Sequence, residues 1–139
     1  MSHPIIPILS AGESGIGSAL LAVRQGFEPW VTDAGNIRDE RAVELREAGI
    51  EFESGGHDEN RLLSLAANGA SIVKSPGIPE DAALIIALRE AGASIISEIE
   101  FASRYARTDA ERVIAITGAN GKTTTTALIA SLFVNAGQE

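Results

Sequence analysis

Short apolar runs alternate along the chain with longer stretches in which apolar residues recur every three or four positions. Short runs predict β-strands, and the three-to-four spacing predicts amphipathic helices. The pattern predicts strands at 5–10, 29–32, 51–53, 71–74, 94–96 and 112–117. It predicts helices over 16–23, 40–48, 59–67, 80–91, 98–106 and 122–136. This alternation indicates βαβ units and an α/β fold with a parallel sheet, whose ligands bind at the carboxyl ends of the strands.

Five glycines punctuate the pattern, each just past an expected helix, where the left-handed conformation costs glycine no clash of a β-carbon. They are Gly26, Gly49, Gly69, Gly92 and Gly137. Pro7 lies inside the first expected strand and cannot donate a hydrogen bond to a neighbouring strand. We therefore expect that strand to be short or irregular.

Composition narrows the class of protein. The 139 residues are 45% hydrophobic and 22% charged, and no apolar run approaches the length that spans a bilayer. The start of the chain lacks the pattern of a signal peptide, so we expect an intracellular, cytoplasmic protein. The net charge of -8 argues against nucleic acid or an anionic membrane as partner. Without cysteine, and with only two histidines, neither a thiolate nor a histidine metal cluster is expected.

A glycine-rich loop, Ser10 to Gly17, follows the first expected strand and opens a helix. It matches the G-x-G-x-x-G pattern at Gly12 and Gly15, with Ser10 in place of the first glycine. In this context unpaired N–H groups and the helix dipole favour a phosphate. Asp33 lies about 20 residues on, where such folds place a carboxylate that binds a sugar or base. The alternative is a tight turn with packing glycines and a helix-capping Asp33.

A second loop, Gly118 to Thr123, reads G-x-x-G-K-T, two residues shorter than the Walker pattern. Its backbone N–H groups can donate hydrogen bonds to phosphate oxygens. Lys122 can bind the β and γ phosphates, and the Thr123 hydroxyl can bind Mg²⁺.

A third feature, Lys74 to Pro79, is a stiff turn that offers the Ser75 hydroxyl and the Gly77 N–H to a ligand, although such turns are common. We interpret His57 as a loop histidine rather than a metal ligand.

The second loop, extended to Thr125 and preceded by Ala115-Ile116-Thr117, resembles the ATP loop of the Mur ligases, the ATP-dependent amide-forming enzymes of peptidoglycan precursor synthesis. Three further segments, Ser10 to Gly17, Ser75 to Pro79 and Ser97 to Phe101, resemble most the members that add D-glutamate to UDP-N-acetylmuramoyl-L-alanine. The resemblance covers nearly the whole chain. Ser10 and the pair Ala34-Gly35 after Asp33 depart from the family pattern.

The resemblance implies a Rossmann-like parallel sheet with helices on both faces, followed by the first βα unit of a P-loop ATPase domain. The implied domains are a UDP-sugar-binding domain over 1–106, a linker over 107–111 and the truncated start of the ATPase domain over 112–139. Because the family continues further, we expect this chain alone to be inactive as a ligase.

The resemblance also implies the site residues, with ATP and Mg²⁺ as cofactors and D-glutamate as second substrate. Those expected to face the UDP-sugar are Gly12, Ser14, Gly15, Gly17, Asp33, Ser75 and Gly77. Those expected at ATP are Gly118, Ala119, Asn120, Gly121, Lys122, Thr123 and Thr124, with Lys122 as the catalytic residue and Thr123 at the metal.

Two other interpretations of the function remain open. A stand-alone Rossmann module for NAD or another dinucleotide, its sheet completed by 107–139, fits Gly12, Gly15 and Asp33 but leaves the second loop unexplained. A purely structural interaction domain leaves both loops without a role.

Overall fold

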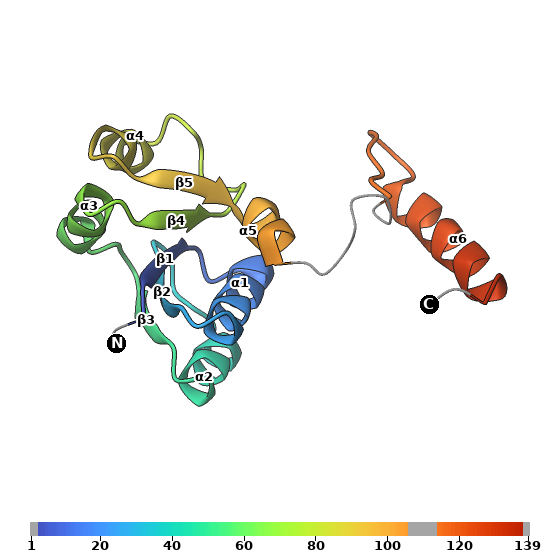
Figure 1. Ribbon diagram of the computed structural model, residues 1–139, viewed down its shortest axis with the longest axis horizontal. Helices are drawn as coiled ribbons and strands as arrows, with labels where there is room; N and C mark the ends of the chain where they lie inside the picture. Colours follow the sequence, from blue (N-terminus) through green and yellow to red (C-terminus); the bar gives the residue numbers. More distant parts are fainter. Residues whose placement is uncertain (1–2, 106–113, 138–139) are drawn as a thin grey trace. The chain divides into compact units, whose positions relative to one another are not determined.

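Five short strands in the first part of the chain form one parallel sheet in the order β3-β2-β1-β4-β5 (Figure 1). The computed structural model describes residues 3–105 and 114–137. The strands are β1 (Ile5–Leu9), β2 (Glu28–Asp33), β3 (Glu51–Ser54), β4 (Ser71–Lys74) and β5 (Ser94–Ser97). The chain divides into two units, Met1–Ala106 and Arg107–Glu139, and the sheet belongs to the first.

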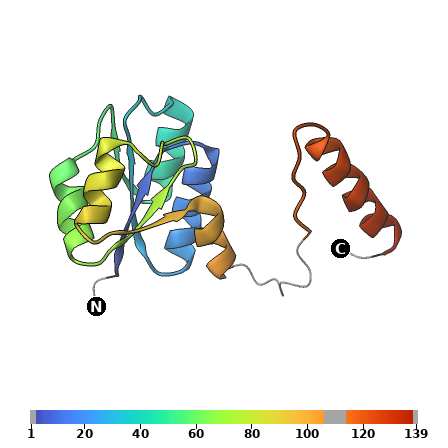
Figure 2. The ribbon, with the colours of Figure 1, turned by 90° about the horizontal axis from the view of Figure 1, so that it is seen from above.

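Helices cover both faces of this sheet, as Figures 1 and 2 show from two directions. They are α1 (Glu13–Arg24), α2 (Asp39–Glu47), α3 (Glu59–Ala67), α4 (Ala83–Glu90) and α5 (Glu98–Tyr105). One face carries α1, α2 and α5, and the other carries α3 and α4. The prediction of an α/β, Rossmann-like parallel sheet with helices on both faces is confirmed.

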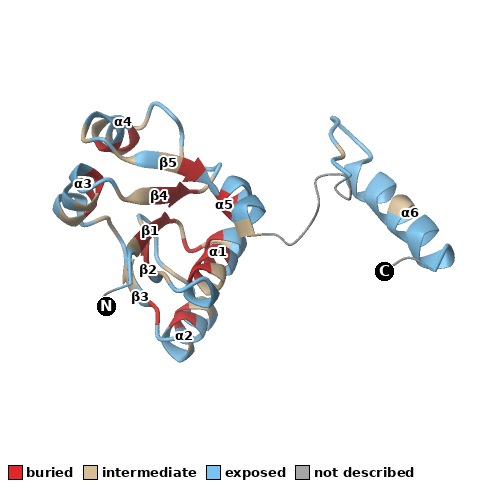
Figure 3. Cartoon of the chain, in the orientation of Figure 1, coloured by how far each residue is buried: buried red, intermediate tan, exposed pale blue. Residues whose placement is uncertain are grey.

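Side chains that alternate along each strand form two apolar cores, one on each face, as the pleat of a strand requires. In β4, Val73 packs beneath α1, α2 and α5, whereas Ile72 packs beneath α3 and α4. Both side chains are fully buried. Figure 3 shows this burial concentrated on the central strands and on the inner sides of the helices. Because the sheet is buried on both faces, a ligand can reach it only at the ends of its strands.

The first strand is more regular than predicted. β1 lies at the centre of the sheet and pairs with β2 over all five of its residues. On its other side the pairing with β4 includes only Ile8 and Leu9. Pro7 is fully buried, and the pairing begins after it because its nitrogen has no hydrogen to donate. The expectation of a short or irregular strand thus holds for the pairing toward β4, which is short, and not for the pairing with β2, which is regular.

The helix ends agree with the glycine pattern. Gly26, Gly49, Gly69 and Gly92 have φ angles between 68° and 98°, and Gly137 has φ 71°. This is the left-handed region in which an L side chain would be strained. At the other end, the helix predicted over 80–91 begins only at Ala83, because the residues after Pro79 form a turn.

The described part of the second unit, 114–137, is a loop followed by α6 (Lys122–Asn135), in which no residue is buried. Residues 114–117 were expected at the end of a strand but are not a strand, because no other described segment pairs with them. The predicted linker, 107–111, and the first two residues of that strand lie outside the described residues. None of the described helices combines the length and apolarity needed to cross a membrane.

Candidate functional site

A cleft of about 430 Å³ opens at the carboxyl edge of the sheet, where the chain leaves β1, β2 and β4. It lies at the point where the strand order reverses, because β2 and β4 flank β1 on opposite sides. The cleft brings together three of the predicted residues, Asp33, Ser75 and Gly77. Its other lining residues are Ser10, Ala34, His57, Ile78, Pro79, Ala82 and Leu84. A larger cavity of about 530 Å³ lies at the amino edge, away from every predicted loop.

Asp33 fixes the glycine-rich loop to the next turn. Its Oδ2 accepts a hydrogen bond from the Ala11 N–H at 2.7 Å, and its Oδ1 accepts one from the Gly35 N–H at 2.8 Å. The Ala11 carbonyl is held as well, since it accepts a hydrogen bond from Arg41 on α2 at 2.7 Å. Both oxygens of Asp33 therefore already have protein partners, so this carboxylate positions the wall of the cleft.

Ser10 and Gly15 make the loop tight. Ser10 has φ 121°, a conformation that L side chains rarely adopt, at the position where the nucleotide-binding pattern has glycine. Its Oγ accepts a hydrogen bond from the Gly12 N–H at 3.1 Å. A β-carbon on Gly15 would lie 2.1 Å from the Ser10 carbonyl oxygen, so only glycine fits there. Gly15 thus lets α1 begin directly against the end of β1, whereas Gly17 has open space.

The amino end of α1 has no side-chain cap, which leaves its first N–H groups without a capping partner in the described structure. The Ser14 hydroxyl, predicted to face a diphosphate, donates a hydrogen bond to Oε2 of Glu98 at 2.7 Å, and its place at a ligand stays a prediction. Glu98 is the first residue of α5 and is only 5% exposed, and its Oε1 is buried without a hydrogen-bond partner among the described residues. Ser14 therefore links the loop to α5, and the unpaired N–H groups remain for an anion.

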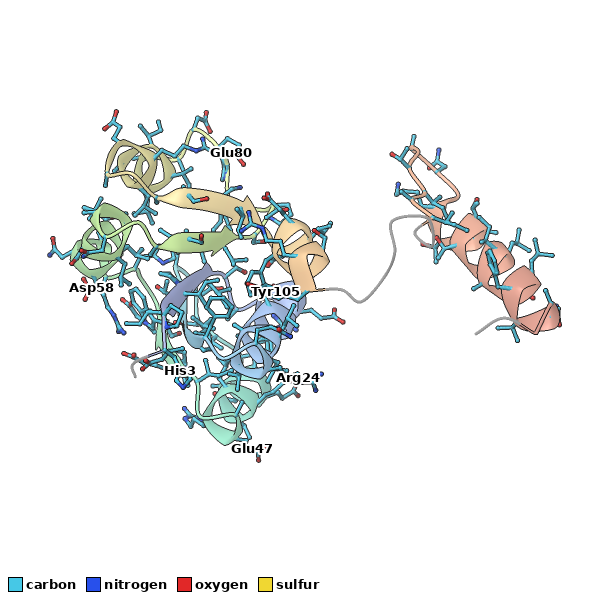
Figure 4. All side chains as sticks on the ribbon, viewed as in Figure 1. His3, Arg24, Glu47, Asp58, Glu80 and Tyr105 are labelled. Atoms are coloured by element: carbon cyan, nitrogen blue, oxygen red, sulfur yellow. The ribbon has the colours of Figure 1, made fainter. Side chains whose placement is uncertain are left out.

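Lys74 holds the turn between β4 and α4. Its ammonium, nearly buried, donates hydrogen bonds to the carbonyls of Ile78 at 2.7 Å and Ser75 at 3.3 Å, and pairs with Glu80 at 2.9 Å. Glu80 also pairs with Arg89 on α4. These two cations and their hydrogen bonds lower the pKa of the Glu80 carboxyl. The turn that presents Ser75 and Gly77 to the cleft is thus fixed by a charge cluster, near Glu80 in Figure 4.

Thr32 and His57 connect the ends of β2 and β3 beside the cleft. The Thr32 side chain is fully buried, and its Oγ1 lies 2.8 Å from Nδ1 of His57. Asp58, the next residue, caps α3 by accepting a hydrogen bond from the Arg61 N–H. His57 is therefore a loop histidine, as interpreted from the sequence, but one that lines the cleft.

The second loop is described by itself. Gly121 has φ 77° and precedes α6, whose amino end carries no side-chain cap. The Lys122 ammonium donates hydrogen bonds to the carbonyls of Gly118 at 2.5 Å and Ala119 at 3.4 Å. All residues from Gly118 to Thr124 are exposed. The lysine thus lies over its own loop, at the open amino end of a helix.

Sequence reasoning missed four contributors to the site: Thr32, Arg41, Lys74 and Glu98. A signal existed for two of them. Lys74 is a charged residue that ends an apolar strand, and Glu98 lies three residues before the buried Phe101, on the same side of its helix. Nothing in the sequence distinguishes Arg41 from the other charged residues of α2.

The chain resembles curated ligases at high identity, although no family model matches it. It is 53% identical over 132 residues to the UDP-N-acetylmuramoylalanine–D-glutamate ligase of Bacteroides fragilis, covering 95% of this chain and 28% of that protein. The ligases of the same name from Bacteroides thetaiotaomicron and Cytophaga hutchinsonii are 50% and 48% identical, over 94% and 92% of this chain. The chain spans about a quarter of the length of these relatives.

Among solved structures, the crystal structure of a murein peptide ligase from Psychrobacter arcticus superposes with a TM-score of 0.61 at 27% identity. The superposition covers 96% of this chain and 27% of that one. Over nearly all of its length, the chain is therefore similar to the N-terminal region of the UDP-N-acetylmuramoylalanine–D-glutamate ligases, which are Mur ligases.

Proposed function

We propose that the unit Met1–Ala106 binds the uridine diphosphate part of a UDP-sugar in the cleft at the carboxyl edge of its sheet. We further propose that the chain provides the nucleotide-binding region of an ATP-dependent ligase that joins D-glutamate to UDP-N-acetylmuramoyl-L-alanine through an acyl phosphate. The names of the relatives support the reaction, and the cleft supports the place of the first substrate.

The observation that carries this proposal is the position of the cleft beside the uncapped amino end of α1. A diphosphate there would accept hydrogen bonds from the uncapped first N–H groups of α1, which begins at Glu13, and gain from the helix dipole. The nucleoside would lie over the ends of β2 and β4, between Asp33 and the Ser75 to Gly77 turn. Because Asp33 and Arg41 hold the loop at Ala11, the loop is already ordered there before the ligand binds, and binding costs little conformational entropy.

The second loop fits ATP and Mg²⁺ in its chemistry. The uncapped N–H groups before and within the first turn of α6 suit phosphate oxygens, Lys122 suits the β and γ phosphates, and the Thr123 hydroxyl suits Mg²⁺. Bound there, ATP would supply the phosphoryl group that activates the carboxylate of the first substrate. For this the Lys122 ammonium must exchange the Gly118 carbonyl for a phosphate oxygen.

Titration calorimetry with UDP, NAD and Mg·ATP tests the proposal. We expect UDP to bind and NAD not to bind. Asp33→Ala should weaken UDP binding by roughly 1 to 3 kcal/mol, because the loop loses its anchor and a polar group of the cleft is removed. Glu47→Ala, which removes an exposed carboxylate at the far end of α2, should bind UDP as the wild type does. Preferential binding of NAD would support the dinucleotide module instead, and an unchanged affinity in Asp33→Ala would refute the assigned site.

A further inference from the structure

Three hydrogen-bonding groups surround one buried hydroxyl at the edge of the cleft. Oγ1 of Thr32 lies 2.8 Å from Nδ1 of His57, 3.3 Å from the Gly56 carbonyl oxygen and 3.3 Å from Oε2 of Glu53. A threonine hydroxyl has one hydrogen to donate and two lone pairs with which to accept. The carbonyl and the carboxylate can only accept. The single Thr32 proton therefore has three candidate acceptors, unless the imidazole is itself a donor.

The count of protons selects one tautomer of His57. If Nδ1 carries the hydrogen, it donates to Thr32, and the Thr32 hydroxyl is free to donate to Gly56 or Glu53, which gives two hydrogen bonds. If Nδ1 is bare, the hydroxyl donates to it, and both oxygens lose their donor. Glu53 and Gly56 are half-buried, so water replaces a lost donor there only in part, and the arrangement with more hydrogen bonds is favoured. In a neutral imidazole with Nδ1–H, Nε2 is an acceptor.

We propose that His57 is a specificity-determining residue of the cleft, whose Nε2 accepts a hydrogen bond from a donor of the bound nucleoside. His57 lines the cleft together with Asp33, and no described residue is hydrogen-bonded to its Nε2. UDP carries two kinds of donor at its nucleoside end, the uracil imide N–H and the ribose hydroxyls. This inference rests on the proposed binding of UDP.

Two substitutions separate the ring nitrogens. In His57→Asn the side-chain amide can still donate to Thr32, as Nδ1 does, but nothing replaces Nε2. In His57→Gln an amide oxygen can reach the position of Nε2 and accept. We expect His57→Asn to bind UDP about three- to tenfold more weakly with little change in melting temperature, and His57→Gln to retain most of the affinity. Equal affinity of wild type and His57→Asn would overturn the proposal.

Three ligands identify the donor. If the donor is a ribose hydroxyl, the difference between wild type and His57→Asn should disappear with 2′-deoxy-UDP or with 3′-deoxy-UDP. If it is the imide, the difference should disappear with CDP, whose N3 carries no hydrogen. A difference that persists with all three ligands would overturn the assigned contact. Failure of the wild type to bind UDP at all would refute the proposed function itself, a result distinct from equal binding by the two proteins.

Nitrogen NMR of the imidazoles tests the tautomer in the wild-type protein without a substitution in the site. The chain has only two histidines, and His3→Gln assigns the spectrum. We expect Nδ1 of His57 to have the shift of a protonated nitrogen and Nε2 that of a bare one, which moves when UDP is added. The opposite tautomer, or an Nε2 signal that UDP does not move, would contradict the proposal.

Discussion

At Gly15 the first turn of α1 touches the backbone of the preceding strand. A β-carbon there would lie 2.1 Å from the Ser10 carbonyl oxygen, and backbone cannot give way as a flexible side chain can. We expect Gly15→Ala to destabilise the protein by about 3 kcal/mol, at the upper end for overpacking. Gly17→Ala is the matched control, because nothing lies within 4 Å of its position and alanine favours a helix. Urea unfolding should show the two changes to have opposite signs.

Ser10 has a strained conformation that the glycine of the common pattern would avoid. Non-glycine residues in such regions cost roughly 1 to 3 kcal/mol. Ser10→Ala and Ser10→Gly both remove the Oγ that accepts from Gly12, but only the second removes the strained β-carbon. We expect Ser10→Gly to be about 1 kcal/mol more stable than Ser10→Ala in urea unfolding. Equal stabilities of Ser10→Gly and Ser10→Ala would show that the backbone at position 10 relaxes around a β-carbon.

Single residues also show where sequence reasoning stops. Spacing located Asp33 at the end of its strand, but not that both its oxygens accept backbone N–H groups. Ser14 was expected to face a ligand, and its partner is Glu98, 84 positions away in the chain. Hydrogen bonds between residues so distant in sequence depend on the packing of α5 against α1, which no local pattern specifies.

Among the elements, the turn between β4 and α4 depends on pH through Glu80. Lys74 and Arg89 lower the pKa of this carboxyl in the folded protein. A carboxyl whose pKa is lowered by folding stabilises the fold at pH values above its ordinary pKa near 4.5. This stabilisation is lost as the pH falls through the lowered pKa. We expect the loss of stability between pH 7 and pH 3 to be smaller in Glu80→Gln than in the wild type. Denaturant unfolding at several pH values measures the free energy of unfolding of both proteins.

Glu90→Gln is the matched control for this cluster, since Glu90 is also exposed and lies at the end of α4. It should follow the pH dependence of the wild type. If Glu80→Gln does so as well, the charge cluster contributes nothing measurable to the fold, as is common for exposed ion pairs.

The elements themselves were largely predictable. Every strand of the first unit lies where the apolar runs placed it, because short runs between polar stretches fit a sheet buried on both faces. The exceptions are local. Pro7 is tolerated at the centre of the sheet because only its pairing toward β4 is shortened, and the turn after Pro79 delays α4 to Ala83.

For the whole molecule, the two units differ in how far their loops are supported. The first loop lies against a sheet with two apolar cores and is held by Asp33 and Arg41. In the second unit no described residue of α6 is buried, and Leu128, Leu132 and Val134 are 62%, 68% and 70% exposed. From Ala127 to Val134 every residue of α6 except Ser131 is apolar, and a helical segment that is apolar on all sides is normally buried in a protein interior.

This difference predicts which nucleotide the chain binds more tightly. Ordering a loop costs roughly 1 to 2 kcal/mol per residue in backbone entropy, and from Gly118 to Thr123 the described residues contribute no buried contact to offset that cost. Lys122 must also leave the Gly118 and Ala119 carbonyls before it reaches a phosphate. We expect Mg·ATP to bind much more weakly than UDP in calorimetry, and Lys122→Ala to leave the melting temperature nearly unchanged. Submicromolar binding of Mg·ATP that Lys122→Ala abolishes would show instead that this loop is already ordered for its ligand.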